Sequence, residues 1–277
     1  MKHQKIKIAL LLIITLLTQT ITIANAQAPT YTAPAYGKIL TERGGFTDIA
    51  QSPSAENILK LRMMGIIQGS AGTKYNPTAL LTRQEAAIYL IRIIGKDQEA
   101  IEKGEAIAAR QSKTNYIADT WAVGYIEEAI TQGILTGNDL KEMETLTEAE
   151  EKAIDKQVEA EARKQWMTIA KRDALKAEKI TAAKMQKKNM KKPISRQDLA
   201  LWIFRTLKLD NLSQTDINAI YGYNDWNAVK PNRLTAVETL LQKNIIPAAT
   251  INNYNPNDGI NRAAAADLLS KIITDYP

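Results

Sequence analysis

The sequence of 277 residues contains no cysteine and a single histidine, His3. The absence of cysteine excludes disulfides, thiolate nucleophiles and cysteine-ligated zinc, and one histidine near the start argues against a Ser-His-Asp triad. Glycine-rich phosphate loops and acidic calcium-type loops are also absent from the sequence. A carboxylate pair or a Ser-Lys dyad stays open chemically, but no motif indicates one. We therefore expect a protein without enzymatic activity, cofactor or metal.

Long apolar runs are scarce as well. The run from Ile8 to Leu17 follows three lysines and precedes Ala24-Asn25-Ala26. It is too short to cross a bilayer, and its flanks are typical of a secretory signal peptide. We predict that residues 1–26 are this signal peptide and that residues 27–45 are a leader or linker. Because no later run approaches the length of a membrane span, we expect a secreted protein without one.

Charge of one sign is not in large excess. The formal net charge of the whole chain is +6. Three of the lysines lie in the predicted signal peptide, which leaves 33 basic and 30 acidic residues, a net charge of +3, in the other 251. So small an excess gives little attraction for nucleic acid, and we expect no nucleic-acid partner.

Three stretches of the chain repeat one pattern. They are LTRQEAAIYL at 81–90, ISRQDLALWI at 194–203 and INRAAAADLL at 260–269. Each has a small polar residue, then an arginine, then apolar residues with helical spacing, so each predicts the start of a helix. The arginines are Arg83, Arg196 and Arg262. The helix dipole disfavours a cation in the first turn, so helix stability alone does not explain them.

A second feature precedes each arginine at a related spacing. Gly69 ends the sequence GIIQG 14 residues before the first arginine, and Ala248 lies 14 residues before the third. Gly137 ends GILTG 59 residues before the second arginine, which is 14 plus 45. The chain therefore contains three related units, and the middle one carries an insertion.

Each unit opens with an aspartate and continues with two predicted helices. The aspartates are Asp48, Asp119 and Asp225. Apolar residues at i, i+3, i+4 and i+7 predict an amphipathic helix after each aspartate, and the arginine stretch starts the second helix. The units span residues 46–95, 116–208 and 221–275, the second with an insertion at 138–192. Residues 96–115 are expected to connect two units, and helical turns can occur in them.

The order of these features resembles the S-layer homology domain. In the first unit the resemblance rests on Phe-Thr-Asp at 46–48, Gly-Ile-Ile-Gln-Gly at 65–69, Asn-Pro at 76–77 and Thr-Arg-Gln-Glu at 82–85. The resemblance implies an all-α fold in which three helix-loop-helix repeats form a pseudo-threefold assembly. It also implies inter-repeat grooves that bind an anionic, often pyruvylated, secondary cell-wall polysaccharide. Such a protein is held at the cell wall of the bacterial envelope, in association with the surface layer.

Two explanations of the arginines stay open. A guanidinium beside free backbone N–H groups at a helix start can bind a carboxylate or phosphate of a ligand. Alternatively, each arginine pairs with an aspartate of a neighbouring unit, although an exposed pair contributes only about 0–1 kcal/mol. We favour ligand binding, because the arginine is retained while the capping residues weaken from the first unit, with Thr82 and Glu85, to the third.

A sugar-binding groove also needs an aromatic face. Trp121 of the middle unit lies where the resemblance places a tryptophan, whereas the first and third units have Pro53 and Asn232 there. We therefore expect one or two complete grooves at most, the best one combining Trp121 with Arg83 and Asp119 between the first and second units. The predicted ligand-binding residues are Arg83, Arg196, Arg262, Asp48, Asp119, Asp225, Trp121, Gly69 and Gly137.

The insertion at 138–192 contains neither glycine nor proline and is rich in helix-forming residues. One straight helix from Thr145 to Met190 would be about 69 Å long and would hold apart two ends that the middle unit needs together. Residues 138–161 have nine acidic and three basic side chains, while residues 162–192 have eleven basic and two acidic ones. We therefore predict a helical hairpin that bends between Arg163 and Arg172. Its predicted apolar ladder is Ile154, Val158, Ala162 and Trp166.

We predict a non-catalytic module that anchors to the cell wall by binding the secondary cell-wall polymer or another peptidoglycan-linked anionic polysaccharide. An alternative is an adaptor in which the grooves are degenerate and the charged hairpin at 138–192 recruits another envelope protein. A solvated spacer is the simplest alternative for the hairpin itself. A carboxylate-based glycan hydrolase is the third hypothesis for the whole chain.

Overall fold

The computed structural model describes residues 45–69, 73–209 and 218–275. The predicted signal peptide and all but the last residue of the predicted leader lie outside these residues. Ten α-helices and two short 3-10 helices form the described part, where extended segments meet only in isolated bridges and no sheet forms. The all-α prediction is confirmed. No described helix is both long and apolar enough to cross a bilayer.

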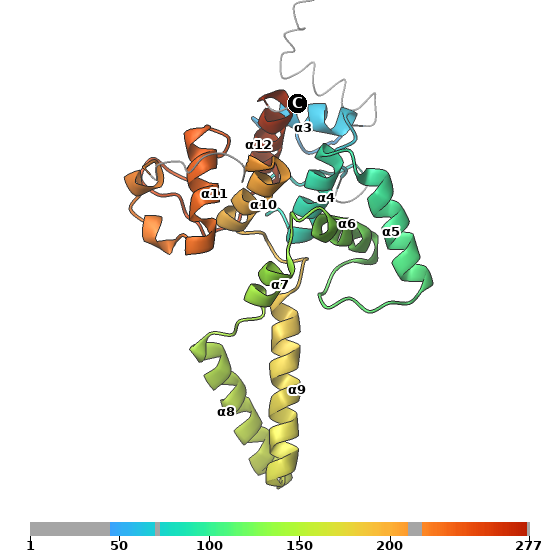
Figure 1. The fold of residues 1–277 in the computed structure, drawn as a ribbon, viewed down its shortest axis with the longest axis vertical. Helices are drawn as coiled ribbons and strands as arrows, with labels where there is room; N and C mark the ends of the chain where they lie inside the picture. The colour runs from blue at the N-terminus through green and yellow to red at the C-terminus, as the bar shows by residue number, and fades with distance from the viewer. Residues whose placement is uncertain (1–44, 70–72, 210–217, 276–277) are drawn as a thin grey trace, which may run out of the picture.

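Three helices open with the repeated arginine stretch and meet at the centre of the body (Figure 1). They are α4 (Arg83–Ile93), α10 (Arg196–Thr206) and α12 (Arg262–Asp275). Their inward side chains are buried because the apolar positions recur with helical spacing. Tyr89, Leu90, Trp202, Leu268 and Leu269 are at most 4% exposed and belong to one hydrophobic cluster.

Three further helices pack on the central ones in a cyclic order. They are α3 (Ala55–Met63), α6 (Thr120–Thr131) and α11 (Pro231–Gln242). Helix α3 packs against α12, α6 against α4, and α11 against α10. The first helix of each unit therefore packs on the central helix of another unit, so the three units interlock in a closed ring.

Backbone hydrogen bonds at the starts of the central helices follow the same cyclic order. The first N–H groups of a helix have no partner inside the helix, and here each start donates to the loop of another unit. The bonds run from Arg83 N to Lys192 O at 3.0 Å, from Arg196 N to Asp258 O at 2.9 Å, and from Arg262 N to Ala79 O at 2.8 Å. The central helices are thus joined at their N-terminal ends as well as along their apolar faces.

Glycine or asparagine follows the first helix of each unit. Gly65 and Gly133 follow α3 and α6 with φ of +75° and +72°, and Asn244 takes the same left-handed conformation after α11. Glycine and asparagine adopt it with the least strain, which is why they end these helices. Thr82 and Glu85 form the predicted capping box of α4.

Residues 96–115, which connect the first two units, include a regular helix. They contain α5 (Asp97–Ala109), a helix of 13 residues that packs against α6. The two backbones meet closely at Gly104 and Gly124, where a Cβ on Gly124 would lie 2.0 Å from the carbonyl oxygen of Ala100. The sequence did not indicate the full length of this helix, because α5 has one buried residue, Ala100, and therefore a weak apolar pattern.

The insertion forms the predicted helical hairpin, which projects away from the body (Figure 1). Helix α8 (Glu148–Gln165) and helix α9 (Ile169–Lys187) run side by side and are joined by residues 166–168, inside the predicted bend. Ile154 and Val158 are buried between the arms as predicted. Trp166 is not part of this ladder, because it ends α8 in the left-handed conformation and is 92% exposed.

Opposite charges face each other across the hairpin, as the acidic and basic halves of the insertion predicted. Carboxylates of α8 pair with basic side chains of α9 along its whole length. The pairs are Glu150–Lys187 at 2.7 Å, Asp155–Lys176 at 2.6 Å, Glu159–Arg172 at 3.0 Å and Glu161–Lys179 at 2.8 Å. Each pair is partly exposed and adds little alone, so the charges select the pairing of the arms more than they stabilise it.

Candidate functional site

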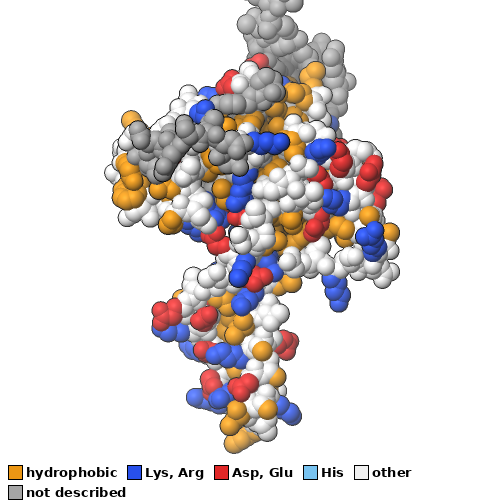
Figure 2. All heavy atoms as spheres, in the orientation of Figure 1, with side chains coloured by type: hydrophobic (Ala, Val, Ile, Leu, Met, Phe, Trp, Pro, Cys, Tyr) orange, Lys and Arg blue, Asp and Glu red, His pale blue; other side chains and the backbone are white. Residues whose placement is uncertain are grey.

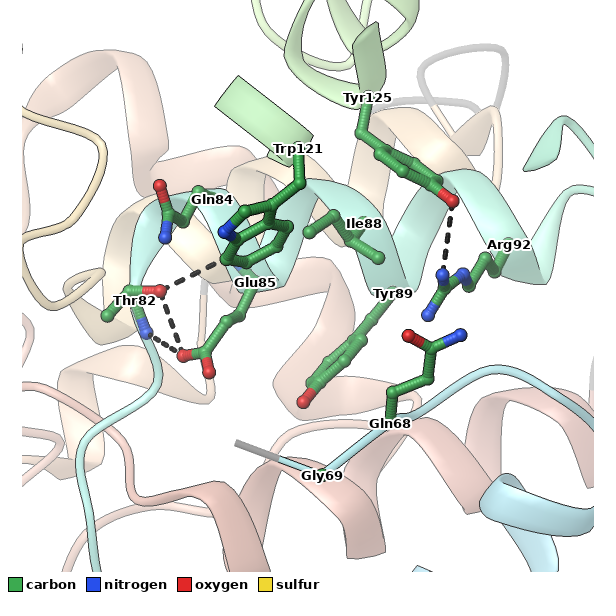
Figure 3. Close-up of a pocket in the computed structure, with 10 residues that line it drawn as sticks. All are labelled: Gln68, Gly69, Thr82, Gln84, Glu85, Ile88, Tyr89, Arg92, Trp121 and Tyr125. Atoms are coloured by element: carbon green, nitrogen blue, oxygen red, sulfur yellow. Dashed lines mark hydrogen bonds between the residues drawn. The ribbon is translucent and has the colours of Figure 1, made fainter. Parts of the chain in front are cut away.

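A cavity of about 320 Å³ lies between α4 and α6. Its aromatic side chains are Trp121 and Tyr125 of α6 and Tyr89 of α4. Figure 3 shows the two α6 side chains reaching toward α4, with Gln68 and Gly69 on the opposite side. The side chain of Trp121 is 58% exposed. A flat, accessible indole face offers a large apolar contact area of the kind that suits a sugar ring.

The start of α6, which carries Trp121, is held against α4 by Gln84. The side-chain amide of Gln84 donates to Asp119 Oδ2 at 2.8 Å, and its carbonyl accepts from Asp119 N at 3.1 Å. Gln84 is only 5% exposed, so a lost bond would leave a buried amide without a partner. Gln84 thereby positions the tryptophan, which lies two residues after Asp119.

Glu85 lines the cavity, but both oxygens of its carboxylate already have partners within the protein. One oxygen accepts from the backbone and the side chain of Thr82 at 2.9 and 2.8 Å (Figure 3). The other oxygen forms an ion pair with Arg262. Because this pair compensates the charge, Glu85 closes the first turn of α4 and does not give the cavity a free negative charge.

Arg92 brings a guanidinium to the other end of the cavity, where Asp97 pairs with it. Its Nε donates to Asp97 at 2.7 Å, one terminal nitrogen donates to Tyr125 Oη at 3.1 Å, and the other donates to Ile66 O at 3.3 Å. Burial alone would raise the pKa of Asp97, but hydrogen bonds from Tyr125 and Arg92 outweigh it and lower that pKa. A guanidinium has five N–H donors, so these three bonds leave donor capacity for a ligand.

The cavity unites only part of the predicted best site. Trp121 and Gly69 line it as expected, whereas Arg83 and Asp119 are not among its lining residues. The guanidinium of Arg83 donates to Lys187 O at 2.9 Å and to Asn189 O at 3.4 Å, outside the cavity. The cation beside Trp121 is therefore Arg92, which the sequence analysis did not single out.

The other two arginines of the repeated stretch also bind backbone carbonyls of another unit. Arg196 donates to Tyr254 O at 2.9 Å and to Pro247 O. Arg262 donates to Tyr75 O at 2.7 Å and is 2% exposed. This arrangement agrees with the explanation that the arginines hold the units together, except that their partners are carbonyl groups and Glu85 in place of the aspartates.

The aspartates that open the units order loops or helix starts. Asp48 accepts from Tyr75 N and Asn76 N, both at 2.8 Å, and so fixes the Asn-Pro loop of the first unit. Asp225 does the same for the third unit, with Tyr254 N at 2.8 Å and Asn255 N at 2.7 Å. Asp119 instead contacts Gln84 and pairs with Lys191 at 2.8 Å. Asp48 also lines a second cavity, which is described below.

Helix α7 (Gly137–Met143) occupies the place between α10 and α11 that corresponds to the Trp121 cavity, because its carboxylates contact Arg205 of α10 and both Asn232 and Arg233 of α11. Arg205 lies nine residues after Arg196, as Arg92 lies nine after Arg83. It donates to Ile134 O at 2.9 Å and to Asp139 of α7 at 2.6 Å. Gly137, predicted to let a ligand approach the backbone, is instead the first residue of α7, whose capping box starts at Thr136.

The carboxylates of α7 satisfy the cations of this second groove. Arg233 is 3% exposed and pairs with Glu142 at 2.6 Å and with Asp198 at 3.1 Å. Lys230 also pairs with Glu142 at 2.6 Å. Burial alone would raise the pKa of Asp139, but hydrogen bonds from Arg205 and the Thr136 cap lower it. The chain thus places its own anionic groups where the first groove is open.

The corresponding place between α12 and α3 is open but chemically different. A cavity of about 480 Å³ lies there, lined in part by Asp48, Ser54 and Asp267. Asp267 accepts from Ser54 Oγ at 2.7 Å and from Asn57 Nδ2 at 2.8 Å. No aromatic or basic side chain lines this cavity among the described residues. Two carboxylates would repel an anionic ligand.

Comparison with known families places the geometry in context. Two segments match the S-layer homology domain. They are residues 45–87 and residues 222–266, which contain α3 with the start of α4, and α11 with the start of α12. The middle unit is not matched. No curated protein matches the chain significantly.

S-layer homology domains commonly anchor proteins to cell-wall polymers, so the two matched segments indicate a protein of the cell surface that is associated with the cell wall. The two matched segments share one pattern of contacts. In both, the aspartate binds two consecutive backbone N–H groups, and the tyrosine of that pair, Tyr75 or Tyr254, lies beneath a central-helix arginine. No group of three or more potential metal ligands occurs within the described ranges.

The sequence analysis missed Gln84, Arg92 and Arg205. A signal for two of them was present, because Arg92 and Arg205 occupy the same position relative to the repeated arginine. Gln84 and Gln197 also share a position, directly after that arginine, and Gln197 accepts from Lys230 N at 2.9 Å as Gln84 does from Asp119 N at 3.1 Å. Aligning the stretches beyond the arginine would have found all three.

Proposed function

We propose that the chain is a non-catalytic cell-wall anchor with three S-layer homology repeats, the middle one interrupted by the hairpin. The proposal for the middle repeat, residues 116–208, is supported by the cyclic packing of α3, α6 and α11 and by the matching backbone bonds at the three central helices. An insertion between the two halves of a repeat explains why a family model would fail to match it.

The proposed ligand is an anionic polysaccharide of the secondary cell-wall polymer, bound in the cavity between α4 and α6. The observation that carries this proposal is the exposed face of Trp121 beside polar groups and Arg92 in one cavity. The sugar ring packs on the indole, and its acidic substituent points toward Arg92. Gly69 lets the chain of the polymer approach the backbone.

One cavity binds the polymer in this proposal. The second groove is closed by Asp139 and Glu142 of α7, which occupy its cations. The third lacks an aromatic or basic lining residue and has Asp48 and Asp267. We further propose that the protein is exported through the signal peptide at 1–26 and reaches the wall as a secreted protein.

Sedimentation with purified cell-wall sacculi tests this function. The chain should sediment with intact sacculi, and Trp121→Ala should weaken the binding by about five- to thirtyfold, because one good aromatic contact contributes on the order of 1–2 kcal/mol. Trp226→Ala is the matched control, since Trp226 is also an exposed tryptophan but lies outside the cavity.

A second arm of the experiment separates the wall polymer from a protein partner. Chemical removal of the secondary polymer from the sacculi should abolish sedimentation. If binding survives this treatment, or if Trp121→Ala binds as the wild type does, the proposal fails. The adaptor hypothesis, in which the hairpin recruits an envelope protein, would then explain the binding better.

A further inference from the structure

The far end of the hairpin carries exposed apolar side chains. Trp166 is 92% exposed and Ile169 is 71% exposed, which are among the largest exposures of apolar residues in the described chain. Helix α8 has 18 residues and is therefore about 27 Å long, so these side chains stand well away from the body. Figure 2 shows hydrophobic side chains at the end of the hairpin, with Lys and Arg side chains beside them. We call residues 162–172 the tip.

The tip has positive charge that the hairpin does not neutralise. Residues 162–172 include four basic residues and no acidic one. Arg172 pairs with Glu159 at 3.0 Å. Arg163, Lys164 and Lys171 are exposed and take part in no ion pair within the described residues. This contrasts with the arms, where carboxylates and ammonium groups face each other.

The backbone geometry keeps the apolar side chains outside. Trp166 ends α8 in the left-handed conformation, with φ of 50°, and turns the chain within three residues. The buried ladder of the hairpin ends before it, at Val158. The indole therefore has no place between the arms and lies at the end of the hairpin, beside Met167 and Ile169.

We propose that the tip binds the surface of an anionic phospholipid bilayer. Tryptophan is enriched at the membrane–water interface, where its ring sits at the level of the headgroups. Lysine and arginine near the surface are attracted to anionic lipid, and each adds to the binding. Binding of this kind is peripheral and needs no membrane span. It is independent of the wall polymer, so the two ends of the molecule hold two different surfaces.

Other occupants fit the tip less well. A second copy of the chain would bring two positively charged tips together, which costs electrostatic energy. An acidic protein would satisfy the charge but would need its own apolar recess for Trp166 and Ile169. A bilayer surface offers anionic headgroups to the basic side chains of the tip. Directly beneath the headgroups it offers an apolar layer to Trp166 and Ile169.

Vesicle sedimentation with the full-length mature chain tests the proposal. The chain should bind vesicles that contain phosphatidylglycerol and should bind pure phosphatidylcholine vesicles at least about tenfold more weakly. The double variant Trp166→Ser, Ile169→Ser and the triple variant Arg163→Gln, Lys164→Gln, Lys171→Gln should each lose at least about tenfold in binding. Binding should also weaken with added salt, since salt screens the attraction.

Matched controls change the same chemistry elsewhere. Ile251→Ser removes an apolar side chain that is 91% exposed on the body, and a triple change of Lys156, Lys184 and Lys243 to Gln removes the same charge from exposed positions outside the tip. Neither control should change binding by more than about twofold. Trp166 fluorescence, taken as the difference from Trp166→Phe, should shift to shorter wavelength with anionic vesicles.

Three outcomes would overturn the proposal: no binding to anionic vesicles, equal binding by the tip variants and the wild type, or no change in Trp166 fluorescence. If the tip captures a protein but does not bind anionic vesicles, the first of these outcomes has occurred and the proposal is overturned. The proposed wall binding can be separated from these outcomes, because Trp121→Ala should keep vesicle binding and the tip variants should keep sacculus binding.

Discussion

Arg262 and Tyr75 bind each other twice, although 187 residues separate them in the sequence. Arg262 Nε donates to Tyr75 O at 2.7 Å, and Tyr75 Oη donates back to Arg262 O at 2.8 Å. The guanidinium also lies 4.6 Å from the centre of the tyrosine ring. Arg196 and Tyr254 repeat this arrangement, with bonds of 2.9 and 3.3 Å. These pairs close the ring of units.

The closing pair predicts that Arg262 stabilises the fold. Arg262→Lys keeps the charge but cannot reproduce the planar donor set that reaches both Tyr75 O and Glu85, so the free energy of unfolding should fall by about 2 kcal/mol. Urea denaturation followed by circular dichroism measures it. Arg110→Lys, at an exposed end of α5, is the control. A loss below about 0.5 kcal/mol in Arg262→Lys would contradict the structural role of the arginine.

The close approach of α5 and α6 predicts different results at two glycines. Gly124→Ala should destabilise the protein by about 1–3 kcal/mol, because the new methyl group would lie 2.0 Å from Ala100 O and force the helices apart. Gly104→Ala should be tolerated, since its nearest atoms would lie at 3.4 Å and alanine favours helix. Thermal unfolding of both variants checks this. If Gly124→Ala and Gly104→Ala unfold at the same temperature, the two helices can move apart without loss of stability.

The ion pairs between helix α7 and the cations of the second groove predict that the stability of the fold depends on pH. The pKa values of Asp139 and Glu142 are lowered in the folded protein. Their contribution to stability is therefore complete above their unfolded pKa of about 4 and is lost as the pH falls through the lower folded pKa. Asp139→Asn should cost about 3 kcal/mol at pH 7, because Arg205 and Arg233 lose a buried partner.

The difference between Asp139→Asn and the wild type should shrink as the pH falls below about 4, because Asp139 of the unfolded wild type then binds a proton that the folded protein does not, which favours unfolding. Denaturant midpoints measured at several pH values follow it. Glu178→Gln, exposed on α9, should show no such change. A constant difference at every pH would mean that Asp139 acts through its capping bonds and not through its charge.

The repeated spacing and the charge pattern of the insertion predicted much of the fold. The constant 14-residue interval located the insertion, and the opposite charges of its halves predicted a hairpin whose bend does lie at residues 166–168. Both predictions rest on local patterns that survive in the folded chain. Helices α5 and α7 were not predicted as separate elements, because few of their residues are buried and apolar spacing is therefore weak.

The site was harder to predict because each cavity is built by two units. The repeats show that three helix pairs exist, but not that α6 packs on α4 while α3 packs on α12. This exchange moves Trp121 away from Arg196 of its own unit and places it beside Arg92. The positions of Trp121 and Gly69 in the repeat agree with their place in the cavity, whereas the contacts of Arg83 depend on residues 187–189, at the end of α9.

The packing of α3 on α12 has a consequence for synthesis of the chain. Helix α3 emerges from the ribosome early, yet the partner that covers its apolar face begins only at Arg262. Until then Ile58 and Leu61, which are fully buried in the finished ring, have no permanent neighbour to shield them. Contacts this distant in sequence form slowly. Assembly of the body must therefore wait until α12 has been synthesised, and a holding chaperone would find its target in α3.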